Sequence, residues 1–91
     1  MPLHIAARDD HRDVADLLIA KGADANAPIA NGNTALYVAS LDGHTDVADV
    51  LLDHGTNVAM KSNAGITPLY VASQNVYEAV VALLRQHGAT G

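Results

Sequence analysis

Apolar residues recur along the chain at helical spacing, and the whole pattern repeats after 33 residues, since position 2 matches positions 35 and 68. The first stretch of each copy covers residues 2–7, 35–40 or 68–73, and its apolar residues share one helical face. A second apolar stripe follows in the same register, at Val14, Val47 and Val80 and at Leu18, Leu51 and Leu84. Repetition at this period predicts a stack of helix pairs.

The predicted helices have recognisable starts and stops. Thr34 and Thr67 precede the first helices and can cap them, because a threonine oxygen accepts an N–H group that the first turn leaves unbonded. The second helices end before glycines, which suit the left-handed conformation that closes a helix, at Gly22, Gly55 and Gly88. Between copies, residues 26–33 are rich in turn formers, and Asn31-Gly32 is a strong hairpin signal. We expect an exposed finger there.

Composition excludes several classes of protein. Ten acidic residues against five basic ones give a net charge of −5, which makes nucleic acid a poor partner. The absence of cysteine excludes disulfides and thiolate metal sites. No apolar run reaches the roughly 18 residues of a membrane span, and the start lacks the features of a signal peptide. At 91 residues we expect one domain, without membrane contact, in the cytoplasm.

Several recurring motifs resemble the ankyrin repeat family. They are Thr-Pro-Leu-Tyr-Val-Ala-Ser at 67–73, Gly-His at 43–44 and Gly-Ala-Asp-Ala-Asn at 22–26. The resemblance covers the whole chain and implies an all-α repeat solenoid, in which each repeat has a β-hairpin finger followed by two antiparallel helices. About 2.8 repeats fit the length, approximately at 1–31 without its opening hairpin, at 32–64, and at 65–91 in truncated form.

The copies differ where their two helices join. The family joins them through Gly-His, as at Gly43-His44, with the glycine at positive φ. The first copy has Asp10-His11 there, and aspartate tolerates this conformation fairly well. The third copy has Val76-Tyr77, and a β-branched residue at positive φ costs on the order of 1 to 2 kcal/mol. This copy is therefore either strained or turned differently, and we predict that Val76→Gly stabilises the protein.

Neither end of the chain carries the polar residues that usually cap repeat arrays. The first end keeps the internal apolar pattern at Ile5, Ala6, Ala15 and Ile19. The other end keeps it through residues 80–84, relieved by Arg85 and Gln86. Two explanations stay open: the chain is a piece of a longer array, or it covers its ends by forming a homo-oligomer.

Five histidines and ten carboxylates prompt a search for a metal or catalytic site. Equivalent residues of stacked helices lie about 8 to 10 Å apart, whereas each metal ligand must reach within about 2.0 to 2.2 Å of the ion. The resemblance gives His4 a hydrogen bond within its own turn, and Tyr37 and Tyr70 replace it in later copies. Ser40 and Ser73 have no evident base in reach. We expect no enzyme activity, metal or cofactor.

Charged residues gather on the second helices. An outward acidic face is predicted, as a solvated surface or as an attraction for a basic partner, at Asp13, Asp16, Asp46, Asp49 and Asp53. His54 and His87 stand just before helix-ending glycines, where the carbonyl end of a helix favours a cation. Slight pH dependence of stability is expected from them.

The resemblance also implies a function, because ankyrin repeats bind other proteins through hairpin tips and the exposed side of their first helices. Carried onto the matching positions, this concave face consists of Arg8, Asp9, Ala30, Asn31, Asn33, Leu41, Asp42, Lys61, Asn63, Ala64, Ile66, Gln74 and Asn75. Leu41 and Ile66 are the candidate anchors, since they are large apolar members of a mainly polar set.

Two functions of different kinds therefore remain. The first is a non-catalytic module that binds a protein partner through the concave face. The alternative is an assembly element whose uncapped terminal repeats stack on other repeats. Loss of binding on substitution of the concave face favours the first, and a mass that rises with concentration favours the second.

Overall fold

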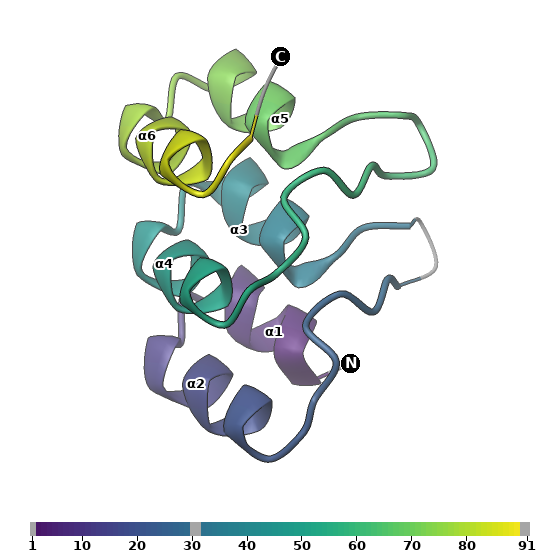
Figure 1. Cartoon of the computed structure of the whole chain (residues 1–91), viewed down its shortest axis with the longest axis vertical. Helices are drawn as coiled ribbons and strands as arrows, with labels where there is room; N and C mark the ends of the chain where they lie inside the picture. Colours follow the sequence, from purple (N-terminus) through teal and green to yellow (C-terminus); the bar gives the residue numbers. More distant parts are fainter. Residues whose placement is uncertain (1, 30–31, 90–91) are drawn as a thin grey trace.

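The chain folds into three antiparallel helix pairs, as the computed structural model shows for residues 2–29 and 32–89 (Figure 1). The pairs are α1 (Pro2–Arg8) with α2 (Arg12–Ala20), α3 (Ala35–Asp42) with α4 (Thr45–Asp53), and α5 (Pro68–Gln74) with α6 (Glu78–Gln86). One layer contains α1, α3 and α5, the other contains α2, α4 and α6, and each helix packs on its counterpart in the next pair. The predicted all-α solenoid is confirmed.

Local hydrogen bonds begin the first helices where the sequence predicts. The Tyr37 backbone N–H donates to Thr34 Oγ1 at 3.2 Å, and the Tyr70 N–H donates to Thr67 Oγ1 at 3.1 Å. Pro68 occupies the first turn of α5, where its missing N–H leaves no donor unbonded. Both predicted threonine caps are therefore confirmed.

The turn inside each helix pair has the same backbone form in all three described pairs. A residue at positive φ precedes each second helix: Asp10 (57°), Gly43 (71°) and Val76 (59°). The residue that follows it donates its backbone N–H to a carbonyl of the first helix at 2.9 Å. The donors are His11, His44 and Tyr77, and the acceptors are Ala6, Ala39 and Ala72 in the same order. Val76 thus adopts the conformation that suits glycine, which makes the third turn strained rather than differently folded.

Small and medium apolar residues form the core between the two layers. Ala39, Ala48 and Ala72 are fully buried, which lets neighbouring helices approach closely. The larger core side chains are Leu36, Val47, Leu51, Val80 and Leu84. Ser40 is also fully buried, and its hydroxyl donates to the Leu36 carbonyl at 2.7 Å. This bond satisfies the hydroxyl inside its own helix, so Ser40 is a packing residue.

Two fingers project from the same side of the stack (Figure 1). In the first, the Ile29 N–H donates to the Asn33 carbonyl at 3.1 Å, and in the second the Ser62 N–H donates to the Ile66 carbonyl at 2.9 Å. No strand occurs among the described residues, but these bonds close both fingers at their bases. Within residues 2–29 and 32–89, no helix is long and apolar enough to cross a membrane.

Candidate functional site

Six of the predicted concave-face residues form one row across the ends of the first helices. They occupy the same two consecutive positions in each helix pair: Arg8 and Asp9, Leu41 and Asp42, Gln74 and Asn75. All six are exposed, and α1 packs on α3 and α3 on α5, so the row is continuous. We call this set the helix-end row.

Hydrogen bonds hold parts of the helix-end row in place. The Arg8 guanidinium lies 3.3 Å from the Asp9 carboxylate, Gln74 donates to the Tyr70 hydroxyl at 2.8 Å, and Asn75 donates to the Leu41 carbonyl at 3.1 Å. Leu41 itself has 39% of its surface exposed, and it is the apolar member of the row. The row therefore presents one aliphatic side chain among oriented polar groups.

An apolar groove of about 190 Å³ lies beside the row. It is lined by Ile5 and Arg8 of α1, by Val38 of α3 and by Ile29 of the first finger, with His4 at its base. Ile5 is 48% exposed, and Ile29 and Val38 are partly exposed. The groove thus joins the first helices to a finger and has a single cation, Arg8, at its edge.

His4 ties the first helix pair to the first finger. Its Nε2 donates to the Ala27 carbonyl at 3.0 Å, which lies in the segment leading to the finger rather than in the turn of His4 itself. The ring is buried, and burial lowers the pKa of His4 below its ordinary 6.5 although the bond to Ala27 favours the charged form. A neutral His4 is therefore a structural link and a poor general base.

The fingers supply the remaining predicted residues. Lys61, Asn63 and Ala64 are exposed near the second tip, whereas Asn33 and Ile66 are half-buried at the bases of the two fingers. Ala30 and Asn31 lie outside the described residues. The two fingers touch, because a Cβ on Gly32 would lie 2.8 Å from the Asn63 backbone nitrogen. The second tip is thus more open to a partner than the base at Ile66.

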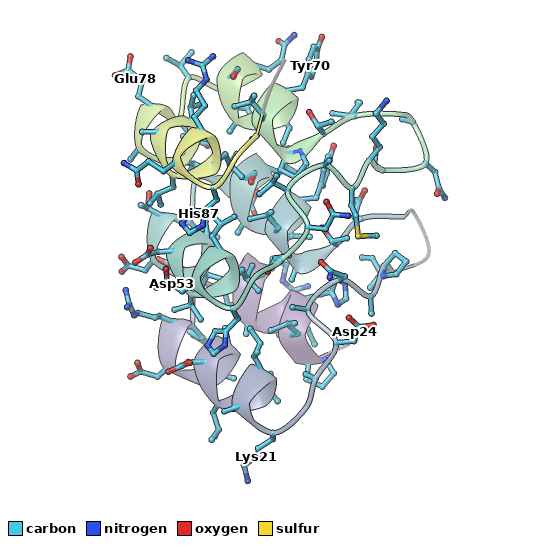
Figure 2. All side chains as sticks on the ribbon, in the orientation of Figure 1. Lys21, Asp24, Asp53, Tyr70, Glu78 and His87 are labelled. Carbon is cyan, nitrogen blue, oxygen red and sulfur yellow. The ribbon has the colours of Figure 1, made fainter. Side chains whose placement is uncertain are left out.

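Sequence reasoning missed several exposed residues of this surface. Tyr70 occupies the position of buried Tyr37 but is 51% exposed, and its ring points away from the stack at the C-terminal end (Figure 2). Ile5 and Val38 have the spacing of core residues, whereas Ile29 lies in the segment that the sequence predicts as an exposed finger. Noting that only one helix pair packs against the third pair in this chain would have identified Tyr70 as exposed. The groove could not have been predicted in this way, because it depends on how the first finger meets α1.

Polar contacts between α2 and the α4 segment involve part of the predicted acidic face. His54 Nε2 donates to the Asp16 carboxylate at 2.9 Å, and Arg12 Nη1 lies 3.8 Å from Asp49 Oδ2. Asp53 points outward from α4 (Figure 2). In the part of the chain that the structure describes, no three histidine or carboxylate side chains gather as a metal site would need. The outer face therefore offers exposed carboxylates, two of which, Asp16 and Asp49, lie against basic side chains of a neighbouring helix pair.

Comparison with known proteins agrees with this architecture. The family model for ankyrin repeats, in three copies, matches residues 2–90. A search of curated proteins found no match.

Among solved structures, the chain is similar to the crystal structure of the human ASB11 ankyrin repeat domain. The two share 34% sequence identity and a TM-score of 0.93, over 99% of this chain and 41% of that one. The chain therefore spans less than half the length of that domain. With the family model covering nearly every residue and the helix pairs superposing this well, the chain belongs to the ankyrin repeat family.

Proposed function

We propose that the chain binds a protein partner through the concave face, here the helix-end row, the adjoining groove and the second finger. Ankyrin repeats are generally protein–protein interaction modules, and the family is generally non-catalytic. The observation that carries the proposal is the apolar groove of Ile5, Ile29 and Val38, open beside a row of fixed polar groups. Apolar pockets with a polar rim are typical of partner recognition.

The charges of this surface favour a particular partner. Asp9, Asp10 and Asp42 are exposed along the helix-end row, and Arg8 is already paired with Asp9. A basic side chain opposite Asp42 would meet an exposed carboxylate whose Oδ2 lies 4.0 Å from His44 Nε2. The groove beside it accepts an aliphatic side chain, because its lining is mainly apolar. We infer a partner segment that carries an aliphatic residue close to a lysine or arginine.

The test compares one substituted concave face with a matched change on the outer face. The first variant carries Leu41→Ala and Asp42→Arg, both at exposed positions that end α3. The control carries Asp53→Arg, the same charge reversal at the exposed last residue of α4. Affinity capture from the lysate of source cells identifies a partner, and calorimetry with the purified partner then measures the dissociation constant for each chain.

We expect the concave variant to weaken binding tenfold or more, about 1.4 kcal/mol, and the control to bind as the parent does. Circular dichroism and urea unfolding establish that all chains are folded before the comparison. Equal weakening by both variants would indicate a general charge effect. Equal binding by all three chains would place the partner elsewhere and refute the concave-face proposal.

A further inference from the structure

One histidine lies beside the helix-end row, between two carboxylates. The His44 Nδ1 atom lies 4.0 Å from Asp10 Oδ2, and its Nε2 atom lies 4.0 Å from Asp42 Oδ2. Asp10 belongs to the turn between α1 and α2, and Asp42 is the last residue of α3. The His44 side chain is 25% exposed, so protons from the solvent reach the ring. A change in the charge of the ring therefore acts on both carboxylates.

The hydrogen bond of this ring fixes where its hydrogen lies. His44 Nε2 is 2.8 Å from the Arg8 backbone carbonyl, which can only accept, so Nε2 donates and carries the hydrogen of the neutral ring. Nδ1 of the neutral ring then has a lone pair on the side of the Asp10 carboxylate. Protonation replaces this lone pair with an N–H group and keeps the bond to Arg8. The ring can thus gain a positive charge without leaving its place.

The charges around the ring make this gain significant. Asp9, Asp10 and Asp42 are exposed, and the Arg8 guanidinium, 3.3 Å from Asp9, offsets one of these carboxylates. A protonated His44 would offset one of the remaining two. The first turns of the packed helices α2, α4 and α6 add further charged groups at this end of the stack, with Arg12 already 3.8 Å from Asp49: Arg12, Asp13, Asp46 and Glu78.

The third helix pair lacks this arrangement. Tyr77 occupies the position of His44, and the amide of Asn75 occupies that of the Asp42 carboxylate. Asn75, instead of a ring nitrogen, donates to the Leu41 carbonyl at 3.1 Å. An amide carries no charge for a neighbouring group to offset. This part of the row therefore serves as a reference within the same molecule.

We propose that His44 is a proton-operated switch of the helix-end row: the neutral ring leaves Asp42 attractive to a basic side chain of the partner, and the protonated ring weakens this attraction. Histidine is the side chain that ordinarily changes its charge between pH 5 and 8, so binding weakens as the pH falls through this range. By linkage, a bound basic group also opposes protonation of His44. The inference rests on the proposed function for the class of partner and adds the condition under which the partner is held.

The first test measures how strongly the row attracts a cation when no partner is present. The probe is a nitroxide that carries a trimethylammonium group, and its effect on the relaxation of amide protons reports its local concentration at each residue. We expect this effect at Asp42 to fall up to about twofold from about pH 7.5 to about pH 5.5 in low salt, and to change less at Asn75. A neutral nitroxide of similar size corrects for any change in exposure.

Two matched variants assign this change to one ring. His44→Gln keeps an N–H donor for the Arg8 carbonyl but cannot be protonated in this range, so the pH dependence at Asp42 should disappear. His11→Gln makes the same substitution at the equivalent, exposed position of the first pair and should keep it. If His44→Gln does not fold, His44→Tyr replaces it, because the third pair has Tyr77 at this position.

Three outcomes of this test would overturn the proposal. They are a cation attraction at Asp42 that does not change with pH in the parent, a pH dependence that survives the loss of His44, and one that His11→Gln abolishes.

The second test uses the partner that affinity capture identifies. Calorimetry at the same two pH values gives the dissociation constant for the parent and for His44→Gln, and titration of the partner is common to both. We expect the constant of the parent to rise about threefold to fivefold at the lower pH, and that of His44→Gln to change less. Equal changes in both chains would refute the switch.

The two proposals fail in different ways. If cation attraction depends on His44 but Leu41→Ala with Asp42→Arg leaves partner binding intact, the switch is present and the proposed concave-face function is wrong. If these substitutions weaken binding but neither cation attraction nor affinity responds to pH through His44, the concave-face function holds and the switch is wrong.

Discussion

At the first junction, between the first and second helix pairs, polar side chains cross from one pair to the other. His44 donates to the Arg8 carbonyl at 2.8 Å, and His54 to the Asp16 carboxylate at 2.9 Å. At the second junction, an aromatic ring takes the equivalent place. The Tyr77 ring lies against Gly43, so close that a Cβ on this glycine would be 2.7 Å from two ring carbons.

The two junctions nevertheless satisfy the same backbone group. The Arg8 and Leu41 carbonyls are equivalent, at the end of the first helix of each pair, and such carbonyls lack partners inside the helix. His44 donates to the first, whereas Asn75 donates to the second at 3.1 Å because Tyr77 has replaced the histidine. A lost donor at one position has thus been compensated two residues earlier in the chain, which the family motif does not indicate.

The largest expected effect comes from adding a methyl group at the second junction. Gly43→Ala places a Cβ against the Tyr77 ring and puts a side chain at a φ of 71°. We expect a loss of about 2 to 4 kcal/mol in the free energy of unfolding, from strain and overpacking together. Urea unfolding measures it.

A double variant shows how much of this loss belongs to the ring. The first junction tolerates Asp10 at a φ of 57° opposite His44, so Tyr77→His should recover roughly half of the loss from Gly43→Ala. Additive effects of the two substitutions would mean that the Tyr77 ring is not what excludes a side chain at Gly43.

Relief of strain at the third turn should give the next largest effect. Val76 has a φ of 59° and is 70% exposed, so Val76→Gly removes strain and forfeits little burial. We expect a gain of about 1 kcal/mol, since glycine's greater freedom in the unfolded chain offsets part of the relief. Asp10→Gly is the matched control with a smaller gain, because aspartate tolerates this conformation better. An unchanged or lower melting temperature for Val76→Gly contradicts the strain argument.

The sequence predicts the parts of this fold that depend on near neighbours along the chain. The register of 33 residues, the caps at Thr34 and Thr67 and the positive φ at Asp10 and Gly43 are all local, and the structure has them. At Val76 the sequence left open whether the turn is strained or folded differently, and the structure shows the strained form. The hydrogen bond from Asn75 joins residues 34 positions apart, and that from His4 joins residues 23 apart. Such contacts depend on how the helix pairs and fingers are placed relative to one another, and the repeat pattern of the sequence does not give this placement.

The candidate site divides in the same way. Its helix-end row follows from register, since Leu41 and Gln74 are equivalent to Arg8. Its groove does not, because Ile5 and Val38 have the spacing of core residues and become part of a surface through the position of Ile29. Residues of a repeat protein that have the spacing of core residues can therefore line an exposed groove where a finger meets the first helices.

A smaller effect is expected from pH, through His4, which stands in the first helix pair where the other two pairs have Tyr37 and Tyr70. Burial lowers the pKa of His4 in the folded protein below 6.5, so the unfolded chain binds this proton more readily. The contribution of His4 to stability is therefore complete above about pH 6.5 and is lost as the pH falls from there through the folded-state pKa.

His4→Tyr tests this dependence, because Tyr37 occupies the equivalent buried position. The variant should have a flatter decline of urea midpoint below pH 6.5 than the parent, with the other histidines common to both chains. Identical slopes would assign the pH dependence to a different group.

The smallest effect is expected from the ion pairs that distinguish the first junction. The Asp16 and His54 side chains are 61% and 35% exposed, and ion pairs of this kind contribute about 0 to 1 kcal/mol, less in high salt. Asp16→Asn should therefore lower stability by no more than about 0.5 kcal/mol, and Asp53→Asn, at an exposed carboxylate on the same layer, is the control. Urea midpoints of the Asp16→Asn and Asp53→Asn variants are compared at low and at high salt. A loss above about 1 kcal/mol in the free energy of unfolding that persists in high salt would mean that these polar side chains stabilise the first junction substantially. A small loss would mean that buried apolar residues provide most of the stability at both junctions. The polar contacts would then determine which helix pairs fit together.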